Sequence, residues 1–221
     1  MTSPEPRNER GPSSRRLGVL ISGRGSNLQA IIDAVDRHRL DAQIAVVISS
    51  RPDASGLARA REAGIEAVIV SPRDHPDRDS CDRIIVDVLA SHRVDLVCLA
   101  GYMRLVGEPL LTAFADRILN IHPSLLPAFP GLEAQKQALE YGVRVSGATV
   151  HLVSSELDGG PIVLQAVVPV LDDDTAETLS SRILVEEHRI YPEAIQLILD
   201  GGWVVEGRRV VRRAPSASTR A

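Results

Sequence analysis

The residues best suited to chemistry in this sequence are an asparagine and a histidine two positions apart. Asn120 and His122 close an apolar run that begins at Ile118, and a proline-rich segment, 123–131, follows them. On a strand, residues two apart point to the same face. An amide donor and an imidazole on one face can stabilise an oxyanion and move a proton. The prolines cannot continue a sheet, so we expect the segment to form a rigid wall.

A pair of this kind is also compatible with a turn residue followed by an ordinary strand end. A second segment, near the start of the chain, favours a functional interpretation. The apolar run 17–21 leads into Ser22-Gly-Arg-Gly-Ser-Asn27, and apolar residues at helical spacing follow. A strand, a glycine-rich loop and a helix place backbone N–H groups and a positive helix end around a phosphate. A tight turn with only a structural role is the alternative.

The glycine-rich loop is also a partial dinucleotide fingerprint. Gly23 and Gly25 match that pattern, but Leu28 stands where the third glycine belongs. The next expected strand ends in 49–51, which carries no acidic residue for a ribose hydroxyl. That residue is part of the nicotinamide-cofactor pattern. We therefore favour a phosphomonoester site over a nicotinamide cofactor.

The elements that position these segments alternate between strands and helices. In the first part of the chain, we expect strands at 17–21, 44–48, 67–70, 94–100 and 118–121, and helices after Asn27 and at 53–63 and 79–90. Repeated strand–helix units predict an α/β fold with a doubly wound, mostly parallel sheet. Ligands of such sheets bind at the carboxyl ends of the strands. The glycine-rich loop, the segment 101–106 and His122 all fall at such ends.

The second part of the chain changes character. We expect a helix at 132–141, strands at 146–153 and 162–170, a helix at 177–199 that Pro192 kinks, and a terminal hairpin at 203–211. The two strands are joined by the acidic loop 154–161, which predicts an antiparallel pair. The whole sheet should then contain about seven strands, with an antiparallel C-terminal part.

Composition narrows the class of protein. The 221 residues are 44% hydrophobic, which suits a single domain, and we place it at 16–211 between disordered tails at 1–15 and 212–221. A formal net charge of −4 and only 3% aromatic residues argue against nucleic-acid binding. No apolar run is long enough to cross a membrane. The two cysteines, Cys81 and Cys98, lack metal-ligand spacing and fit a reducing cytoplasm.

Three motifs together resemble those of a known enzyme family. The segment Asn120-Ile-His-Pro-Ser-Leu-Leu-Pro127 resembles the signature of the folate-dependent formyltransferases. Gly23-Arg-Gly-Ser-Asn-Leu28 and Glu156-Leu-Asp-Gly-Gly-Pro161 extend the resemblance, which runs from about Leu17 to about Trp203. The glycine-rich motif is similar to that of the members that act on glycinamide ribonucleotide. The resemblance implies the Rossmann-like formyltransferase fold.

It also implies an activity. A formyl group would move from 10-formyltetrahydrofolate, as cosubstrate, to the amine of glycinamide ribonucleotide in purine biosynthesis. Such a transfer needs no metal and no enzyme nucleophile, and both partners are small molecules. We expect a cytoplasmic enzyme that binds neither nucleic acid nor membrane. Monomer and homodimer both remain open.

The resemblance assigns roles to individual residues. Asn120, His122 and Asp158 match the catalytic positions. An aspartate before Gly-Gly is usually turn chemistry, and only the motif makes Asp158 catalytic. It would hold His122 protonated or hold a water that carries the proton, and both possibilities stay open. The residues that match the nucleotide site are Gly25, Ser26, Asn27 and Glu187.

The folate site is assigned in the same way. Its matching residues are Arg78, Met103, Arg104, Leu105, Val106, Asn120, Ser154, Ser155, Glu156, Leu157 and Asp158. Without the resemblance, Arg78 would be a solvated residue at a helix start, and the apolar members would be core. We expect His151, Pro123 and Ser124 to shape the site. Three residues depart from relatives, Ala128, Glu133 and Gln135, so the match is weaker for the folate pocket than for the reaction.

Other interpretations use the same residues. A formyltetrahydrofolate hydrolase would use water as acceptor, and it usually carries an additional regulatory domain at its start. A methionyl-tRNA formyltransferase would carry a further C-terminal domain, for which 203–221 is too short. A nucleotide-binding module without catalysis is the alternative from another class. The presence of Asn120, His122 and Asp158 argues against it.

Overall fold

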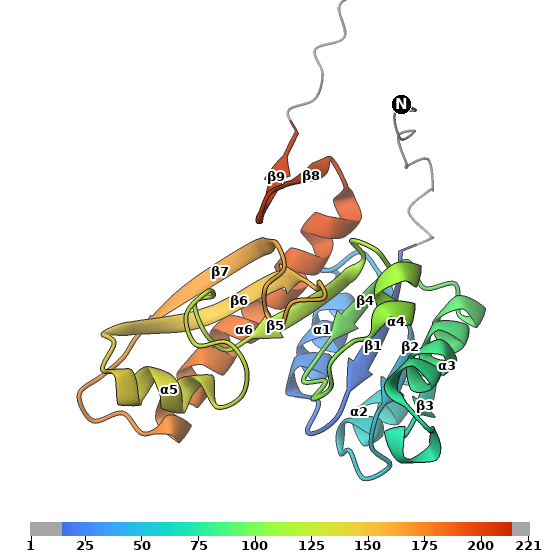
Figure 1. Ribbon diagram of the computed structural model, residues 1–221, viewed down its shortest axis with the longest axis horizontal. Coiled ribbons are helices and arrows are strands. Elements are labelled where there is room, and N and C mark those ends of the chain that lie inside the picture. Colours follow the sequence, from blue (N-terminus) through green and yellow to red (C-terminus); the bar gives the residue numbers. More distant parts are fainter. Residues whose placement is uncertain (1–14, 214–221) are drawn as a thin grey trace, which may run out of the picture.

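Nine strands form one mixed sheet in this structure, a computed structural model that describes residues 15–213 (Figure 1). The strand order is β3-β2-β1-β4-β5-β6-β7-β9-β8. The strands are β1 (Arg16–Ile21), β2 (Gln43–Ser49), β3 (Ala67–Ile69), β4 (Leu96–Leu99), β5 (Ile118–His122), β6 (Val145–Leu152), β7 (Ile162–Pro169), β8 (Trp203–Glu206) and β9 (Arg209–Arg212). The helices are α1 (Ser26–Asp36), α2 (Gly56–Glu62), α3 (Arg78–Ser91), α4 (Glu108–Ala113), α5 (Ala134–Tyr141) and α6 (Ala176–Asp200).

The sheet has a parallel half and an antiparallel half that meet at β5. Strands β1 to β5 pair in parallel, whereas β6 runs antiparallel to both β5 and β7. From β1 the chain moves outward through β2 and β3, and then returns to the other side of β1 with β4 and β5. The carboxyl ends of β1 and β4 therefore border the point where the strand order reverses, which is where open α/β sheets bind ligands.

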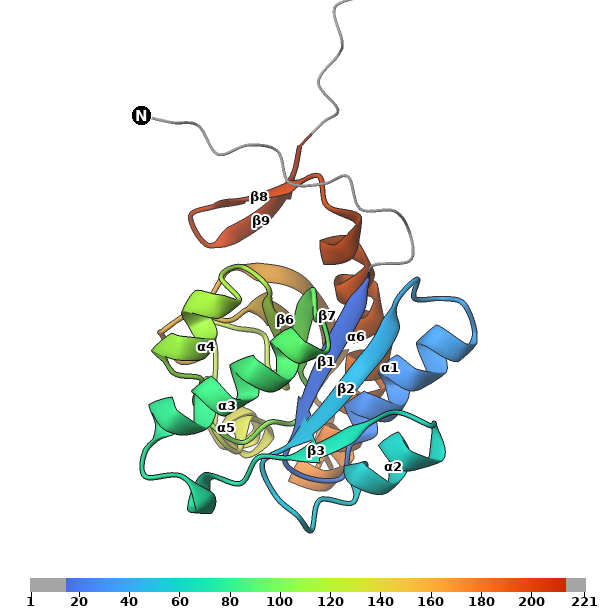
Figure 2. The same ribbon diagram turned by 90° about the vertical axis from the view of Figure 1, so that its right-hand side faces the viewer.

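Helices cover the parallel half on both sides, and two apolar cores result. Val19 and Ile21 of β1 face the core shared with α1 and α6, whereas Leu20 faces the core shared with α3 and α4. This alternation follows from the two-residue period of a strand. Figure 2 shows α1 and α2 on one side of the first strands and α3 and α4 on the other. Gly18 allows α3 to pack closely, because a Cβ there would lie 2.3 Å from Leu89 Cδ2.

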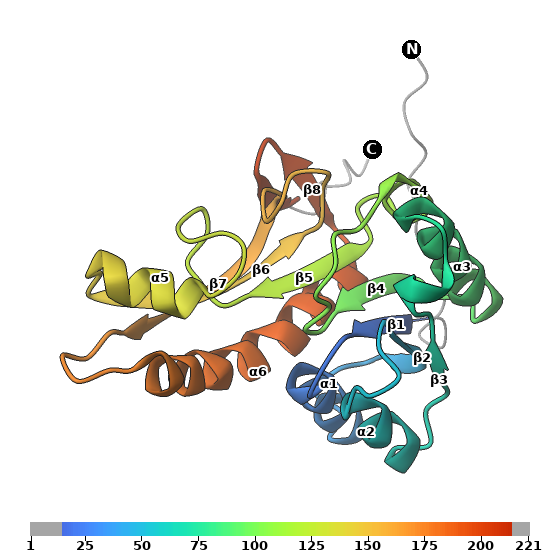
Figure 3. The same ribbon diagram turned by 60° about the horizontal axis from the view of Figure 1, so that its bottom comes forward.

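The long helix α6 connects the two halves. Its 25 residues follow the N-cap residue Thr175, whose side chain accepts from Thr178 N in a capping box. The helix packs against α1 and under β6 and β7, as Figure 3 shows. Near its middle, the buried Tyr191 hydroxyl lies 2.9 Å from Leu99 O and 3.1 Å from Leu119 O. It thus joins the helix to β4 and β5.

The predicted fold is confirmed: the sheet is mostly parallel, with antiparallel strands toward the C-terminus. The expected seven strands are present, and the hairpin β8–β9 adds two more through one pairing, Ile162 with Arg209. Helix α4 was not expected, although Pro109 in its first turn is a start signal. Helix α2 starts three residues later than predicted, at Gly56. The predicted tails lie outside the described residues, apart from Arg15, Arg212 and Arg213.

Candidate active site

Two polar side chains at the carboxyl end of β5 face the same way and meet partners on β6. Asn120 pairs with His151 across the strands, and His122 pairs with Thr149. The amide Nδ2 of Asn120 lies 3.1 Å from His151 Nε2. His151 Nδ1 lies 2.9 Å from the carbonyl of Leu152 and must donate to it. The neutral ring therefore accepts from Asn120 at Nε2, which fixes the amide and leaves its second N–H free to donate.

His122 is buried, and its two ring nitrogens have different partners. Nε2 donates to the carbonyl of Phe129 at 2.8 Å, so a neutral ring keeps its lone pair on Nδ1. Nδ1 lies 3.4 Å from Asp158 Oδ2. Burial lowers the pKa of His122, while the Phe129 carbonyl and the Asp158 carboxylate oppose that effect. The imidazole is thus a neutral base at neutral pH, with a carboxylate beside the atom that would be protonated.

Asp158 reaches this position on the loop that follows β6. The loop folds back over the sheet, and Asp158 adopts a left-handed conformation with φ 49°. Its Oδ2 accepts from Gly131 N at 2.8 Å, and its Oδ1 lies 3.7 Å from His151 Nε2. Burial would raise the pKa of Asp158, but the neighbouring His151 ring, the hydrogen bond from Gly131 N and the charge of His122 outweigh burial and lower the pKa. A strained residue held by several partners is typical of a functional site.

The glycine-rich loop leads directly into α1. Gly25 caps the helix in the left-handed conformation, with φ 71° and no side-chain cap. The first turn of α1 carries no acidic residue, so its unpaired N–H groups favour an anion. Asn27 Nδ2 donates to Glu187 Oε2 of α6 at 2.7 Å, whereas the buried Asn27 Oδ1 has no partner among residues 15–213. Burial raises the pKa of Glu187, and the bond from Asn27 opposes this.

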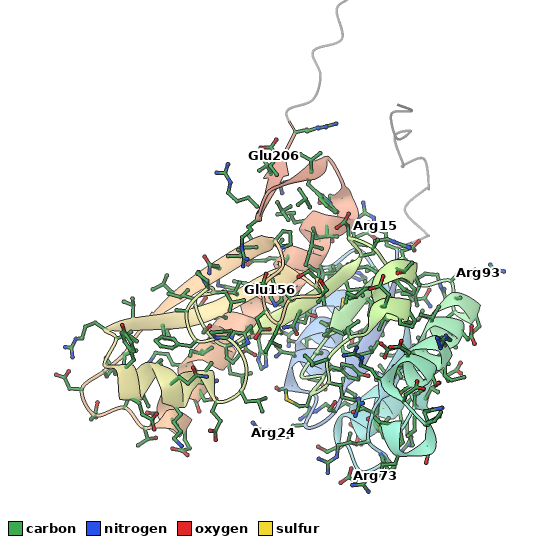
Figure 4. All side chains as sticks on the ribbon, in the orientation of Figure 1. Arg15, Arg24, Arg73, Arg93, Glu156 and Glu206 are labelled. Atoms are coloured by element: carbon green, nitrogen blue, oxygen red, sulfur yellow. The ribbon has the colours of Figure 1, made fainter. Side chains whose placement is uncertain are left out.

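Sequence reasoning missed the residues that support this loop from α2. Gly56 packs so closely that its Cα would lie 2.7 Å from a Cβ at Gly25. Arg59 Nε donates to the carbonyl of Arg24 at 3.0 Å, and Figure 4 shows the Arg24 side chain at the lower edge of the molecule. Only a glycine-bearing helix start at 56 could have hinted at this contact, because the sequence does not show which helix faces the loop.

The residues assigned to the folate site lie on three segments. The segment 103–106 follows β4, and Met103 N donates to Ser22 Oγ beside the glycine-rich loop, at 2.9 Å. Met103 and Leu105 are exposed. Arg78 begins α3 and lies against Gly107, since its Nε would be 3.0 Å from a Cβ there.

The third segment is the loop 154–158. Leu157 is exposed, and its Cδ2 would lie 3.8 Å from a Cβ at Gly131. Glu156, labelled in Figure 4, lies 3.4 Å from Arg208 of the terminal hairpin. The remaining members, Arg104, Val106, Ser154 and Ser155, lie beside these residues in the chain.

The proline-rich segment, 123–131, forms the wall beside His122. Ser124 is fully buried, and its hydroxyl donates to the carbonyl of Ala128. Pro123 follows His122 directly and is half-buried. Of the residues that depart from relatives, Ala128 and Glu133 are exposed and Gln135 is half-buried, in or just after this segment.

Residues 15–213 contain neither a metal-binding cluster nor a membrane-spanning helix. No group of three or more histidine, cysteine, aspartate or glutamate side chains there could hold a metal ion. None of the helices in that range has the length and hydropathy needed to cross a membrane.

Comparison with known proteins gives consistent matches over most of the chain. The model of a family described as formyl transferase matches residues 15–195. The phosphoribosylglycinamide formyltransferase of Escherichia coli (strain K12) is 45% identical over 83% of this chain and 86% of its own length. The trifunctional purine biosynthetic protein adenosine-3 of Drosophila melanogaster is 46% identical over 85% of this chain. The chain spans only 14% of that relative's length.

A crystal structure gives the same result at the level of the fold. Glycinamide ribonucleotide transformylase 1 from Symbiobacterium toebii superposes with a TM-score of 0.90 and is 58% identical. The match covers 96% of this chain and all of the other.

Proposed function

This chain belongs to the formyl transferase family, and from that premise we propose that it formylates glycinamide ribonucleotide with 10-formyltetrahydrofolate as the formyl donor. The observation that carries the proposal is the presence of two polar clusters at one edge of the sheet, where the parallel strands β1 and β5 have their carboxyl ends. Asn120, His122 and Asp158 form one, at the end of β5. Asn27 and Glu187 form the other, beside the helix start at Gly25. The first suits acyl transfer and the second suits a phosphorylated amine.

The nucleotide would bind at the start of α1. Its phosphate fits the N–H groups after Gly25, because an anion is stabilised there by both the hydrogen-bond donors and the helix dipole. Glu187 accepts hydrogen bonds from ribose hydroxyls. Asn27 Oδ1, which is buried without a partner, accepts a further donor from the substrate. These contacts bring the amine toward the end of β5.

The formyl group would lie against Asn120. When the amine attacks the formyl carbon, the carbonyl oxygen gains negative charge. The Asn120 N–H that is not used by His151 stabilises this oxyanion. The exposed apolar side chains of Met103, Leu105 and Leu157 offer a surface for the flat folate ring. Arg78 carries a positive charge that suits the carboxylates of the folate.

Proton transfer completes the reaction. The attacking amine becomes cationic and loses a proton, and the folate N10 gains one as its bond to carbon breaks. His122 Nδ1 accepts the proton and then returns it to N10, directly or through a water. Asp158 stabilises the imidazolium that exists between these steps. Positioning and these proton movements suffice for the reaction, so no enzyme nucleophile is needed.

A continuous absorbance assay tests the proposal. Purified protein is mixed with 10-formyltetrahydrofolate, with and without glycinamide ribonucleotide, and release of the folate product is followed. We expect turnover only when the nucleotide is present, with formylated nucleotide detected by mass spectrometry. Turnover in water alone would instead show a hydrolase. Folded protein without turnover in either mixture would contradict both assignments.

A further inference from the structure

A row of three side chains crosses the antiparallel half of the sheet beneath the proline-rich segment. His122 of β5 pairs with Thr149 of β6, and Thr149 pairs with Gln165 of β7. Side chains of directly paired residues lie on the same face of a sheet. The row therefore begins at the proposed catalytic imidazole and ends at Gln165, a residue on the surface of the protein.

Thr149 and Gln165 attach the proline-rich segment to the sheet. The buried Thr149 hydroxyl donates to Ser124 O at 2.7 Å and accepts from Leu126 N at 3.0 Å. Gln165 Nε2 donates to Leu126 O and to Thr149 Oγ1, each at 2.9 Å. One donated and two accepted bonds use the full capacity of a hydroxyl. The segment is thus held through both the N–H and the carbonyl of Leu126.

After this attachment, two backbone groups of the proline-rich segment form hydrogen bonds with His122 and Asp158. The Phe129 carbonyl accepts from His122 Nε2, and Gly131 N donates to Asp158 Oδ2. Phe129 has φ 54°, a conformation that an aromatic residue keeps only when its surroundings impose it. Only two residues separate Phe129 from Leu126, so a shift at the attachment moves the carbonyl that His122 uses.

We propose that Thr149 and Gln165 are positioning residues, which act through the proline-rich segment to keep the Phe129 carbonyl on His122 Nε2. The tautomer with hydrogen on Nε2 is thereby fixed, and Nδ1, beside the Asp158 carboxylate, is left free to accept the proton from the substrate amine. The kinetic consequence rests on the proposed formyl transfer. The tautomer is a property of the free protein and can be measured without any substrate.

Variants at the two positions test the kinetic part. Thr149→Val keeps the shape and removes the hydroxyl, Thr149→Ser keeps the hydroxyl, and Gln165→Met removes both amide donors. We expect kcat to fall about 10- to 100-fold in Thr149→Val and in Gln165→Met, the scale expected when a catalytic group is slightly misplaced. KM for the nucleotide should stay within about twofold, because neither side chain contacts the nucleotide site, and Thr149→Ser should restore most of kcat. Thr112→Val and Gln43→Met, at exposed positions outside the row, are matched controls.

Nitrogen NMR of the ligand-free protein tests the structural part. With ¹⁵N-labelled histidine, and with His122 assigned by its loss in His122→Gln, we expect the Nε2–H tautomer in the wild type. Thr149→Val and Gln165→Met should give a mixture of tautomers. An unchanged tautomer in both variants overturns the proposal, whatever their rates, and so does a loss of kcat in Thr149→Ser as large as in Thr149→Val.

The same variants and measurements still test the proposal if one variant does not fold or if the wild type is inactive. If Thr149→Val does not fold, Gln165→Met decides by both readouts, since its side chain is exposed. If the wild type transfers no formyl group, the proposed function fails. The tautomer of His122 in the variants then decides the positioning role alone.

Discussion

Replacing Asp158 by asparagine should remove the charge that stabilises the His122 imidazolium while leaving the fold intact. An asparagine oxygen can still accept from Gly131 N, and its amide can face His151 Nε2. Asparagine also tolerates the left-handed conformation that Asp158 adopts, with φ 49°. The variant thus changes one charge without opening a cavity.

The expected effect follows from the distance between the two groups. Unit charges at the 3.4 Å that separates His122 Nδ1 from Asp158 Oδ2 attract by about 5 kcal/mol at an effective dielectric constant of about 20. Loss of that energy from the charged intermediate corresponds to a factor between about 10³ and 10⁴. We therefore expect kcat to fall about 10³-fold, inside the range of about 10² to 10⁴ for acid–base groups.

The assay is the folate absorbance measurement, run across pH. Because Asp158 raises the pKa of His122 against the effect of burial, its loss should move the acidic limb of kcat/KM to lower pH. Asp116→Asn is a matched control, since Asp116 is exposed and also left-handed, with φ 55°. A folded Asp158→Asn enzyme within threefold of the wild type would refute the assigned role, as would an equal loss in Asp116→Asn.

Three other changes test the remaining parts of the site. Asn120→Ala should lower kcat about 10²- to 10³-fold, the scale for one oxyanion donor; an unchanged kcat in the same assay would remove Asn120 from that role. Glu187→Gln should raise KM for the nucleotide. Since burial raises the folded pKa of Glu187, its stabilising contribution is present below about pH 4.3 and is lost as pH rises through the folded value. Urea unfolding should therefore show the Gln variant more stable at pH 8 and equal near pH 4, and the reverse order would contradict burial as the cause. Gly25→Ala should raise KM for the nucleotide but not for the folate, and should cost about 1–3 kcal/mol of stability, because its Cβ would lie 2.7 Å from Gly56 Cα at φ 71°. Equal effects on both KM values would argue against a phosphate site at Gly25.

The order of the elements could be predicted from the sequence because the spacing of apolar residues and the positions of glycines indicate each strand and helix within a short stretch of chain. The period of two along 118–122 was enough to place Asn120 and His122 on one face. Helix α4 was missed because its six residues are too few to show a helical period. The close contact of Gly56 with Gly25 depends on which helix covers the loop, and no local pattern encodes that.

The site was harder to derive than the fold. Asp158 lies 36 positions after His122, and its motif alone predicts a turn, which it also forms. Its place beside His122 depends on the way the loop folds back. Backbone groups such as the Phe129 carbonyl and Gly131 N–H were not predictable, because any residue carries them and only the path of the chain aims them.

Helix α6 has a consequence for how the protein opens. It packs against α1, which begins at the glycine-rich loop, and also against β6 and β7, which carry His151 and Gln165. Amide hydrogen exchange reports such coupling, because segments that share one buried helix open together. An opening that detaches α6 from β6 also withdraws Glu187 from Asn27. Slow-exchanging amides of α1, α6 and β6 should therefore form one cooperative group, and a bound nucleotide should slow exchange in strands that it never touches.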